Sequence, residues 1–405
     1  MYKTLLIHGM PPKNYRFHGV EEIELLFIRH FKTSFVTEHN FFINPSNRIK
    51  NFDFEAIILT STFLSKLSHP KSYNRLINKY AFIKNKNSIK IGLPQDDYWA
   101  QSIKDDWYSK NLDIIVSVFD KKHWPLLYPK SIKNKVKIIR GHTTYINKSN
   151  FSKWKNLPYS NRKYDVVYRT VGNPIFPNKL GLIKSKIGEI FKRKHETELK
   201  LNISKRRKDL IFGEKWLEFL SNSKAVLGSN SGSSIIIRNH DQMLKLIREK
   251  SKFNDSLETF EESFFKKNDR NHCLTDISPR NIEAARTMTL QVLIEGDYGG
   301  VLKKDEDYFC LKEDLSNSSD LLKLLQNKFK VEKITENCYN RIKESETLCE
   351  ENLIGVISNQ IEHFLKKKPR SSNFIKEKTL FEKINYMIFN LKYLIKFQLK
   401  FFLKN

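Results

Sequence analysis

The chain has few cysteines, no long uncharged run and no arginine-rich tract, and each of these absences excludes a class of protein. Its four cysteines, Cys273, Cys310, Cys338 and Cys349, form no C-x-x-C pair, and their spacing suits no common metal site. We therefore expect reduced thiols in a cytosolic protein that binds no metal. No uncharged stretch is long enough to span a bilayer, and the apolar run at the N-terminus is too short for a signal peptide.

The charge of the chain is strongly positive. Lys and Arg number 72 against 45 Asp and Glu, which gives a formal net charge of +27. Such an excess favours an anionic partner: nucleic acid, an anionic membrane or a phosphorylated substrate. The alternative is a general bias toward lysine over the whole surface, because the lysines are scattered along the chain. The sequence has neither a zinc finger nor an RNP-type RNA-binding motif, so we do not expect nucleic acid as a partner.

The first half of the chain alternates between short β-branched runs and helical patterns. Strands are expected at Lys3–Gly9, Phe54–Ser61, Ser88–Gln95, Leu112–Asp120 and Lys135–His142. Alternation of strands and helices predicts parallel βαβ units. A polar stretch, Asn147–Lys163, interrupts the pattern, which restarts at "YDVVYRT". The sequence therefore predicts an α/β protein with one domain at 1–155 and a second at 160–370.

The C-terminal tail, 375–405, has a different composition. Lysines recur every four residues among Leu, Ile, Phe and Tyr, at Lys392, Lys396, Lys400 and Lys404. On a helix they form a basic stripe with a wide apolar face opposite. This pattern favours a helix that lies in the plane of an anionic membrane surface. The alternative is a terminal helix packed on the core, with its lysines in solvent.

Open α/β sheets bind ligands beyond the carboxyl ends of their strands. In the first block those ends carry His8, Asp96, Asp97 and His142. A carboxylate at this edge can serve as a general base toward a hydroxyl nucleophile, so Asp96 and Asp97 are the catalytic candidates. The alternative is that one of them caps the following helix. For the two histidines a structural role is the simpler interpretation.

In the second block the loop "GSNSGSS" follows a strand and offers backbone amides to a phosphate. Ser229, Gly232 and Ser233 are therefore candidates for donor binding. The loop is not a G-x-G-x-x-G and lacks the Walker lysine, so an ordinary flexible loop is the alternative. Arg169 and Lys184 could neutralise a diphosphate, or could be solvated surface charges.

One stretch, "DISPRNIEAARTMTLQVLIEGDYGG", combines a helix start with a strand that ends in Glu-Gly. Ser278 is a plausible N-cap before the proline. Arg280 and Glu283 then lie three residues apart, on one side of the first turn. A Glu at this point could accept hydrogen bonds from two neighbouring sugar hydroxyls, and a local Arg–Glu ion pair is the alternative.

This stretch resembles the C-terminal signature of a bacterial group of GT-B glycosyltransferases, the spore-maturation-protein-like or "glycosyltransferase family 1" proteins of surface-polysaccharide clusters. Three further segments agree in order: "YDVVYRTVGNPIFPNKLGLIKSKIGEIF", "FGEKWLEFLSNSKAVLGSNSGSS" and "IGLPQDDYW" followed by "LDIIVSVF". The similarity covers roughly Ile57–Asn317. It implies two Rossmann-like domains facing across a cleft, with a nucleotide-sugar donor held mainly by the second.

By this resemblance, Glu283 would bind the donor ribose. The same cleft would be lined by Arg280, Glu295 and Gly296. Arg169 and Lys184 would hold the diphosphate. No metal is then strictly needed. The acceptor would be a polysaccharide or lipid-linked saccharide at the inner face of the cytoplasmic membrane. Thr275 replaces the first acid of an E-x₇-E pair, and Val171 replaces the second Arg of Y-R-G-R. The second departure keeps a catalytically inactive scaffold as an alternative.

Overall fold

The computed structural model describes residues 2–31, 35–170, 178–249, 257–366 and 379–402, the last of these without side-chain detail beyond residue 396. The first domain is built on a six-stranded parallel sheet with the order β2-β1-β3-β4-β5-β6. Its strands are β1 Thr4–His8, β2 Val36–Asn40, β3 Ala56–Leu59, β4 Ile89–Gly92, β5 Ile114–Ser117 and β6 Lys137–Arg140. The five strands expected from the sequence are confirmed, and β2 is an addition.

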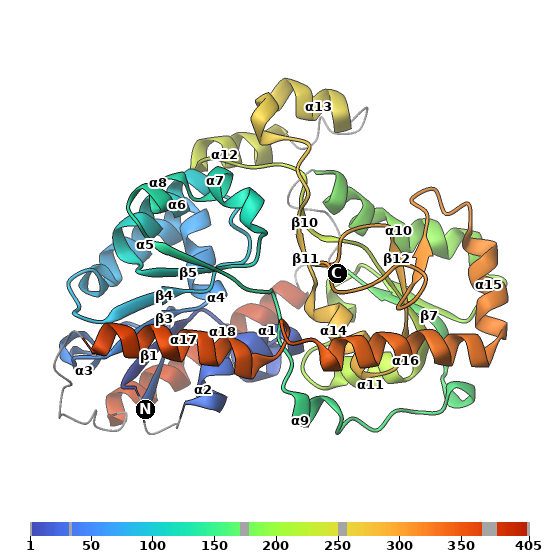
Figure 1. Cartoon of the computed structure of the whole chain (residues 1–405), viewed down its shortest axis with the longest axis horizontal. Helices are drawn as coiled ribbons and strands as arrows, with labels where there is room; N and C mark the ends of the chain where they lie inside the picture. The colour runs from blue at the N-terminus through green and yellow to red at the C-terminus, as the bar shows by residue number, and fades with distance from the viewer. Residues whose placement is uncertain (1, 32–34, 171–177, 250–256, 367–378, 403–405) are drawn as a thin grey trace.

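Helices cover both faces of this sheet (Figure 1). They are α1 His18–Glu24, α2 Leu26–His30, α3 Asn47–Asn51, α4 Ser61–Leu64, α5 Pro70–Lys79, α6 Gln101–Asn111, α7 Trp124–Leu127 and α8 Pro129–Lys133. Each face has its own apolar core: Leu5 and Ile57 point into one, Leu6 and Ile58 into the other. Strands buried on both faces explain why the sequence reads as continuous apolar runs here.

The second domain has a five-stranded parallel sheet with the order β13-β12-β9-β7-β8. Its strands are β7 Tyr164–Arg169, β8 Leu201–Ser204, β9 Ser223–Gly228, β12 Leu290–Ile294 and β13 Phe309–Leu311. Its helices are α10 Lys179–His195, α11 Lys215–Ser221, α14 Pro279–Arg286, α15 Ser318–Gln326 and α16 Lys328–Glu344. The predicted two Rossmann-like domains are thereby confirmed. A connecting segment with the short helix α9 Lys148–Phe151 joins them.

A segment of the second half of the chain crosses back to the first domain. Strands β10 Ser231–Ser233 and β11 Leu274–Asp276 form an antiparallel pair. Helices α12 His240–Glu249 and α13 Leu257–Phe264 come between them in the sequence and lie above them at the top of Figure 1. Ile235 and Ile237, which follow β10, pack with Trp99 of the first domain in one apolar cluster. The prediction that 160–370 forms a single domain therefore needs correction over this segment.

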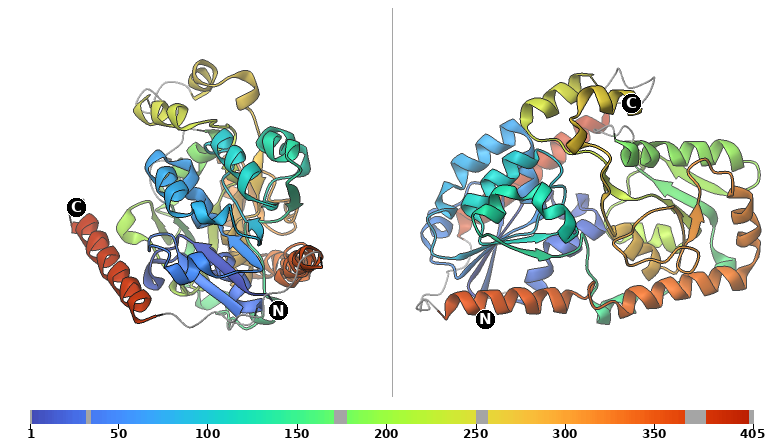
Figure 2. Two further views of the ribbon diagram at one scale, coloured as in Figure 1. Left: turned by 90° about the vertical axis from the view of Figure 1, so that its left-hand side faces the viewer. Right: turned by 45° about the horizontal axis from the view of Figure 1, so that its top comes forward.

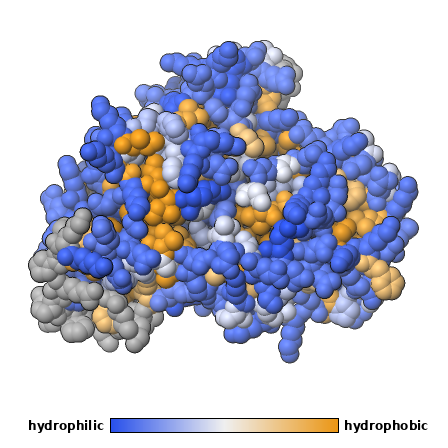
Figure 3. Space-filling view, in the orientation of Figure 1, coloured by the Kyte–Doolittle hydropathy of each residue, from blue (hydrophilic) through white to orange (hydrophobic). Residues whose placement is uncertain are grey.

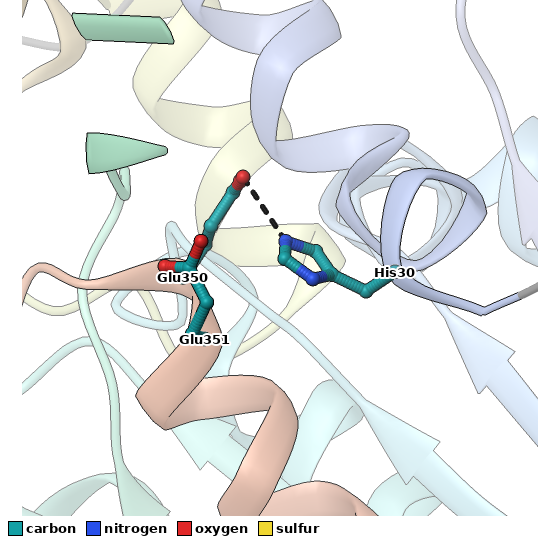
Figure 4. A group of neighbouring side chains, drawn as sticks. All are labelled: His30, Glu350 and Glu351. Atoms are coloured by element: carbon teal, nitrogen blue, oxygen red, sulfur yellow. Dashed lines mark ion pairs between the residues drawn. The ribbon is translucent and has the colours of Figure 1, made fainter. Parts of the chain in front are cut away.

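The same boundary is also wrong at α17 Glu350–Leu365, which packs on the first sheet through Leu353, Ile357 and Ile361. Helices α16 and α17 run one after the other along the bottom of both domains (Figure 1). At the start of α17, Glu350 is fully buried and its carboxylate lies 2.8 Å from Arg29 and 3.0 Å from His30 (Figure 4). Since α17 has apolar residues on a helical period, its sequence shows that it must pack, but not on which domain.

The tail contains the expected helix, α18 Leu380–Phe402, and Figure 2 shows it beside the two domains. One side of α18 contacts the loop after β2. Glu382 is buried against Arg48, with a separation of 3.1 Å, and Phe389 stacks on Phe42 with 5.7 Å between ring centres. No helix in the described part of the chain is long and apolar enough to cross a membrane. Lys404 lies outside the described residues.

Candidate functional site

The carboxyl ends of β7, β9 and β12 meet at the edge of the second sheet where α14 begins. A small pocket opens there between α10 and α14. It is lined by four of the residues selected from the sequence, Lys184, Ser229, Ser278 and Arg280. Parallel strands place their ligands at this edge, so the fold brings these side chains together for the reason that the sequence suggested.

Lys184 is the central cation of the pocket. Burial and, to a lesser extent, the nearby Arg280 lower the pKa of its ammonium group to about 8, and the charge of Asp96 opposes both effects. Within the described residues, Lys184 has no ion-pair partner. Asp96 belongs to the first domain, is exposed, and accepts a hydrogen bond of 2.7 Å from Tyr98. The predicted base Asp96 and the predicted diphosphate ligand Lys184 therefore act on one another across the two domains.

Two buried polar atoms at the end of β9 lack partners among the described residues. They are Ser229 Oγ, beside the pocket, and Asn230 Oδ1. A buried polar atom without a hydrogen bond costs about 1–3 kcal/mol, so a hydroxyl or amide donor from a ligand would relieve this cost. Asn230 lies against Gly296, where any Cβ would collide with the Asn230 amide. The position of Asn230 therefore favours glycine at 296. The sequence indicated the loop that contains Asn230 as a donor-binding loop, but not Asn230 itself.

Glu283 is buried on α14 and both of its carboxylate oxygens already have partners. Trp216 Nε1 donates to Oε2 at 2.7 Å, and His18 Nδ1 of the first domain lies 3.1 Å from Oε1. Burial lowers the pKa of His18, but the hydrogen bond and the charge of Glu283 outweigh it, so the pKa is raised. Instead of an Arg280–Glu283 pair, Arg280 donates to the carbonyl of Arg169 and stacks over Trp216.

Arg169 does not reach the pocket. Its guanidinium donates to the carbonyl and the side-chain oxygen of Asn202, both at 2.7 Å, and lies 4.5 Å from the ring centre of Phe219. These contacts direct the side chain toward β8 and α11. The predicted role as a diphosphate ligand is therefore wrong for Arg169, because its position at a strand end does not reveal which way the side chain turns.

Asp97 is also removed from the cleft. It is 1% exposed, and its carboxylate accepts hydrogen bonds from Tyr108 at 2.9 Å and Tyr128 at 2.6 Å, with Lys104 3.4 Å away. Burial raises the pKa of this carboxyl group. A carboxylate enclosed by two phenols and a lysine has no access to an acceptor hydroxyl. The prediction of Asp97 as a catalytic base is thus corrected, and it does not cap α6 either.

The remaining predicted residues have local roles. Gly232 has φ +138° and pairs so closely with β11 that a side chain would collide with Leu274. Ser233 Oγ donates to the Ile235 carbonyl at 2.8 Å. Neither residue offers the open phosphate loop that was expected.

Two further predicted residues, Glu295 and Ser278, follow the ends of β12 and β11. Glu295 is exposed and pairs with Lys304 at 2.7 Å. The oxygen of Asn281 accepts from both the amide and the hydroxyl of Ser278, which positions the start of α14 beside the pocket.

A buried carboxylate that sequence reasoning missed connects the two domains. Asp276, at the end of β11, is 3% exposed. It accepts a hydrogen bond from the backbone amide of Thr143 at 2.7 Å and lies 2.9 Å from His142 and 3.0 Å from Arg140. All three partners follow or end β6 of the first domain. The edge of the pocket is therefore fixed relative to the first domain by a cluster of charged and polar groups.

No protein-family model matches the sequence, and no curated protein matches it. Several solved structures, however, are similar to this chain. An alpha-glucosyltransferase in complex with UDP-glucose and DNA containing an abasic site is 11% identical, with a TM-score of 0.53 over 88% of this chain and 99% of that one. An alpha-glucosyltransferase (AGT) in complex with UDP is also 11% identical, with a TM-score of 0.51 over 88% of this chain and 100% of that one.

At this level of identity the comparison defines the fold and nothing further. The two parallel-sheet domains match those structures over nearly their whole length. The chain has the GT-B fold of glycosyltransferases, as its sequence resemblance implied.

Proposed function

We propose that the protein is a glycosyltransferase that transfers a sugar from a nucleotide-sugar donor to a polysaccharide or lipid-linked saccharide in cell-surface glycan synthesis. It would belong to the spore-maturation-protein-like group that its C-terminal signature resembles. The observation that carries the proposal is the pocket at the ends of β9 and β12. Lys184 and Arg280 supply cations there, and Ser229 and Asn230 leave buried oxygens without partners.

These groups suit the departure of a nucleoside diphosphate. As the bond between the sugar carbon and the diphosphate oxygen breaks, negative charge grows on the leaving oxygen, and the Lys184 and Arg280 cations stabilise it. Asp96 is exposed and its charge acts on Lys184, so we propose that it takes the proton from the acceptor hydroxyl that attacks the same carbon. Cations of the chain then perform the charge stabilisation, and we propose that no metal ion takes part.

The donor is proposed to be a UDP-sugar, because two structures of the same fold are named with UDP or UDP-glucose as ligand. Isothermal titration calorimetry with UDP-glucose at pH 7 is expected to show saturable binding, and slow hydrolysis of the bound donor is expected on long incubation. Binding without hydrolysis would indicate an inactive scaffold. No binding of UDP-glucose, UDP-N-acetylglucosamine or GDP-mannose would contradict the proposal as a whole.

The membrane is the proposed second partner, at the inner face of the cytoplasmic membrane. The side of α18 that faces away from the protein is apolar and open: Leu380 is 74% exposed, Met387 70% and Leu391 58%. Each such side chain contributes about 1.5–3 kcal/mol when it leaves water, so a few of them suffice for reversible binding. A helix with one docked side and one open apolar side matches an in-plane membrane contact.

Replacing Leu391 by Glu is expected to abolish most flotation with liposomes that contain anionic lipid, because a charge is placed in the middle of the apolar side of α18. Phe329, which is 81% exposed on α16, provides the matched control. Phe329→Glu should leave flotation unchanged, and both variants should keep their affinity for UDP-glucose. Equal flotation of wild type and Leu391→Glu would contradict the membrane role of α18.

A further inference from the structure

A groove of about 1170 Å³ lies beneath α18, and we call it the α18 groove. Three parts of the chain form its walls: the loop after β2 in the first domain, the turn Arg206–Leu210 after β8 in the second, and the side of α18 that faces the protein. Because β2 and β8 are edge strands of their sheets, the groove lies at one end of the region between the two domains. It is separate from the pocket that contains Lys184.

Four cations in the α18 groove have no acidic partner among the described residues. They are Arg207, Lys208, Lys392 and Lys396. Two other cations of the groove have acidic partners: Arg48 pairs with Glu382 and Arg206 with Asp209, while Glu38 lies 2.8 Å from His8. The groove therefore holds an uncompensated positive charge supplied jointly by the second domain and the tail.

Two lysines of α18 line this groove and lie away from the open apolar side of the helix. Lys392 and Lys396 line the groove, whereas Leu391 and Met387 lie on the exposed side of the same helix. Residues four apart lie on one face of a helix, which explains how the lysine stripe and the apolar stripe are separated. Both lysines are exposed and line the groove, so an anion between α18 and the domains would lie within their reach.

The rest of the lining suits a saccharide. Phe42 and Phe389 stack in the groove wall, and Tyr386 and Tyr393 also line the groove. Aromatic rings bury the apolar face of a sugar ring, and the side chains of Asn44 and Asn385 provide both donors and acceptors for hydroxyl groups. The volume exceeds that of a single small ligand, since typical ligand pockets span about 300–1000 Å³.

We infer that the α18 groove binds an anionic saccharide chain, one that carries phosphate or carboxylate groups, as the acceptor or its continuation. The inference rests on the proposed function, because it identifies the acceptor class of that same enzyme. It also gives α18 a second role besides the membrane contact, because α18 supplies one wall of the groove and two of its cations.

The test measures binding of a sulfated hexasaccharide prepared from heparin, at 150 mM salt, by isothermal titration calorimetry. Replacing Lys392 and Lys396 together by Gln is expected to weaken binding about tenfold, since each lost cation removes roughly half to one kcal/mol. Replacing Arg207 and Lys208, on the opposite wall, together by Gln should weaken binding by a similar factor. Lys383, which is exposed on α18 but does not line the groove, is the matched control, and Lys383→Gln should bind like the wild type.

Parallel titrations with UDP-glucose, the neutral maltohexaose and a single-stranded DNA 12-mer separate the remaining outcomes. UDP-glucose should bind all variants equally, and maltohexaose should bind weakly and without dependence on the lysines. The inference is overturned if UDP-glucose binds but the charged hexasaccharide does not, or binds all variants alike. It is also overturned if the DNA 12-mer binds more tightly than the hexasaccharide with the same dependence on the four cations. Loss of UDP-glucose binding by the wild type would instead contradict the proposed function.

Discussion

Replacing Lys184 by Met is expected to weaken UDP-glucose binding about 30-fold and, in the same protein, to raise the free energy of unfolding at pH 7 by about 2 kcal/mol. The loss of affinity follows because the ammonium group is the buried cation of the pocket. The gain in stability follows because burial lowers the pKa of Lys184 to about 8. At neutral pH the folded protein must therefore keep an unfavourably buried charge, and Met removes that cost at similar length.

The dependence of the free energy of unfolding on pH follows from the same shift in the pKa of Lys184. The pKa of Lys184 in the folded protein lies below the ordinary value of 10.5, so burial of the charge costs stability fully below pH 8. The cost disappears as the pH rises from about 8 to about 10.5. The stability advantage of Lys184→Met should thus be greatest near pH 7 and vanish above pH 10.5. Affinity of the wild type for UDP-glucose should fall as the pH rises through 8, when the free ammonium group loses its proton.

Lys186 provides the control, because it lies two residues further along α10 and is exposed. Lys186→Met should change neither the affinity nor the urea midpoint. A Lys184→Met protein that keeps wild-type affinity would remove this lysine from the donor site. One that loses both affinity and stability would identify Lys184 as a structural residue whose loss disturbs the fold.

The sequence predicted most of the fold but only part of the candidate site. Strands such as β3 and β12 are buried on both faces, and their β-branched runs mark them clearly. β2, with the sequence Val-Thr-Glu-His-Asn, is an edge strand whose polar residues resemble a loop, and it was missed. The hydrophilic residues spread over both domains in Figure 3 agree with scattered charge, so composition alone could not locate the α18 groove.

For the site, the sequence identified the correct strand ends but not the direction of each side chain. Lys184 and Arg169 are both cations near one strand end, yet only Lys184 lines the pocket, because Asn202 and Phe219 hold Arg169 elsewhere. Asp96 and Asp97 are adjacent, and neighbours in a chain point in different directions, so one is exposed and the other is buried in the core. Partners from distant segments decide these outcomes, and a single sequence does not reveal them.

The contact at Asp276 allows a second test with a large effect, because it is the point where such distant partners meet. Asp276→Asn is expected to lower the free energy of unfolding by about 3 kcal/mol, measured by urea denaturation. The buried carboxylate accepts from the Thr143 amide and lies within 3.0 Å of both His142 and Arg140, and the neutral amide cannot balance their charge. Asp120 is the matched control: it pairs with the same Arg140 at 3.2 Å but is 49% exposed.

Solvent screens an exposed ion pair, so Asp120→Asn should cost less than about 1 kcal/mol. If the two variants are equally stable, Asp276 is not an essential tie between the domains. If Asp276→Asn alone is destabilised, the buried carboxylate is a tie between the domains that the exposed Asp120–Arg140 pair does not replace. UDP-glucose affinity should then also fall, since Asp276 stands two residues before Ser278, which lines the pocket.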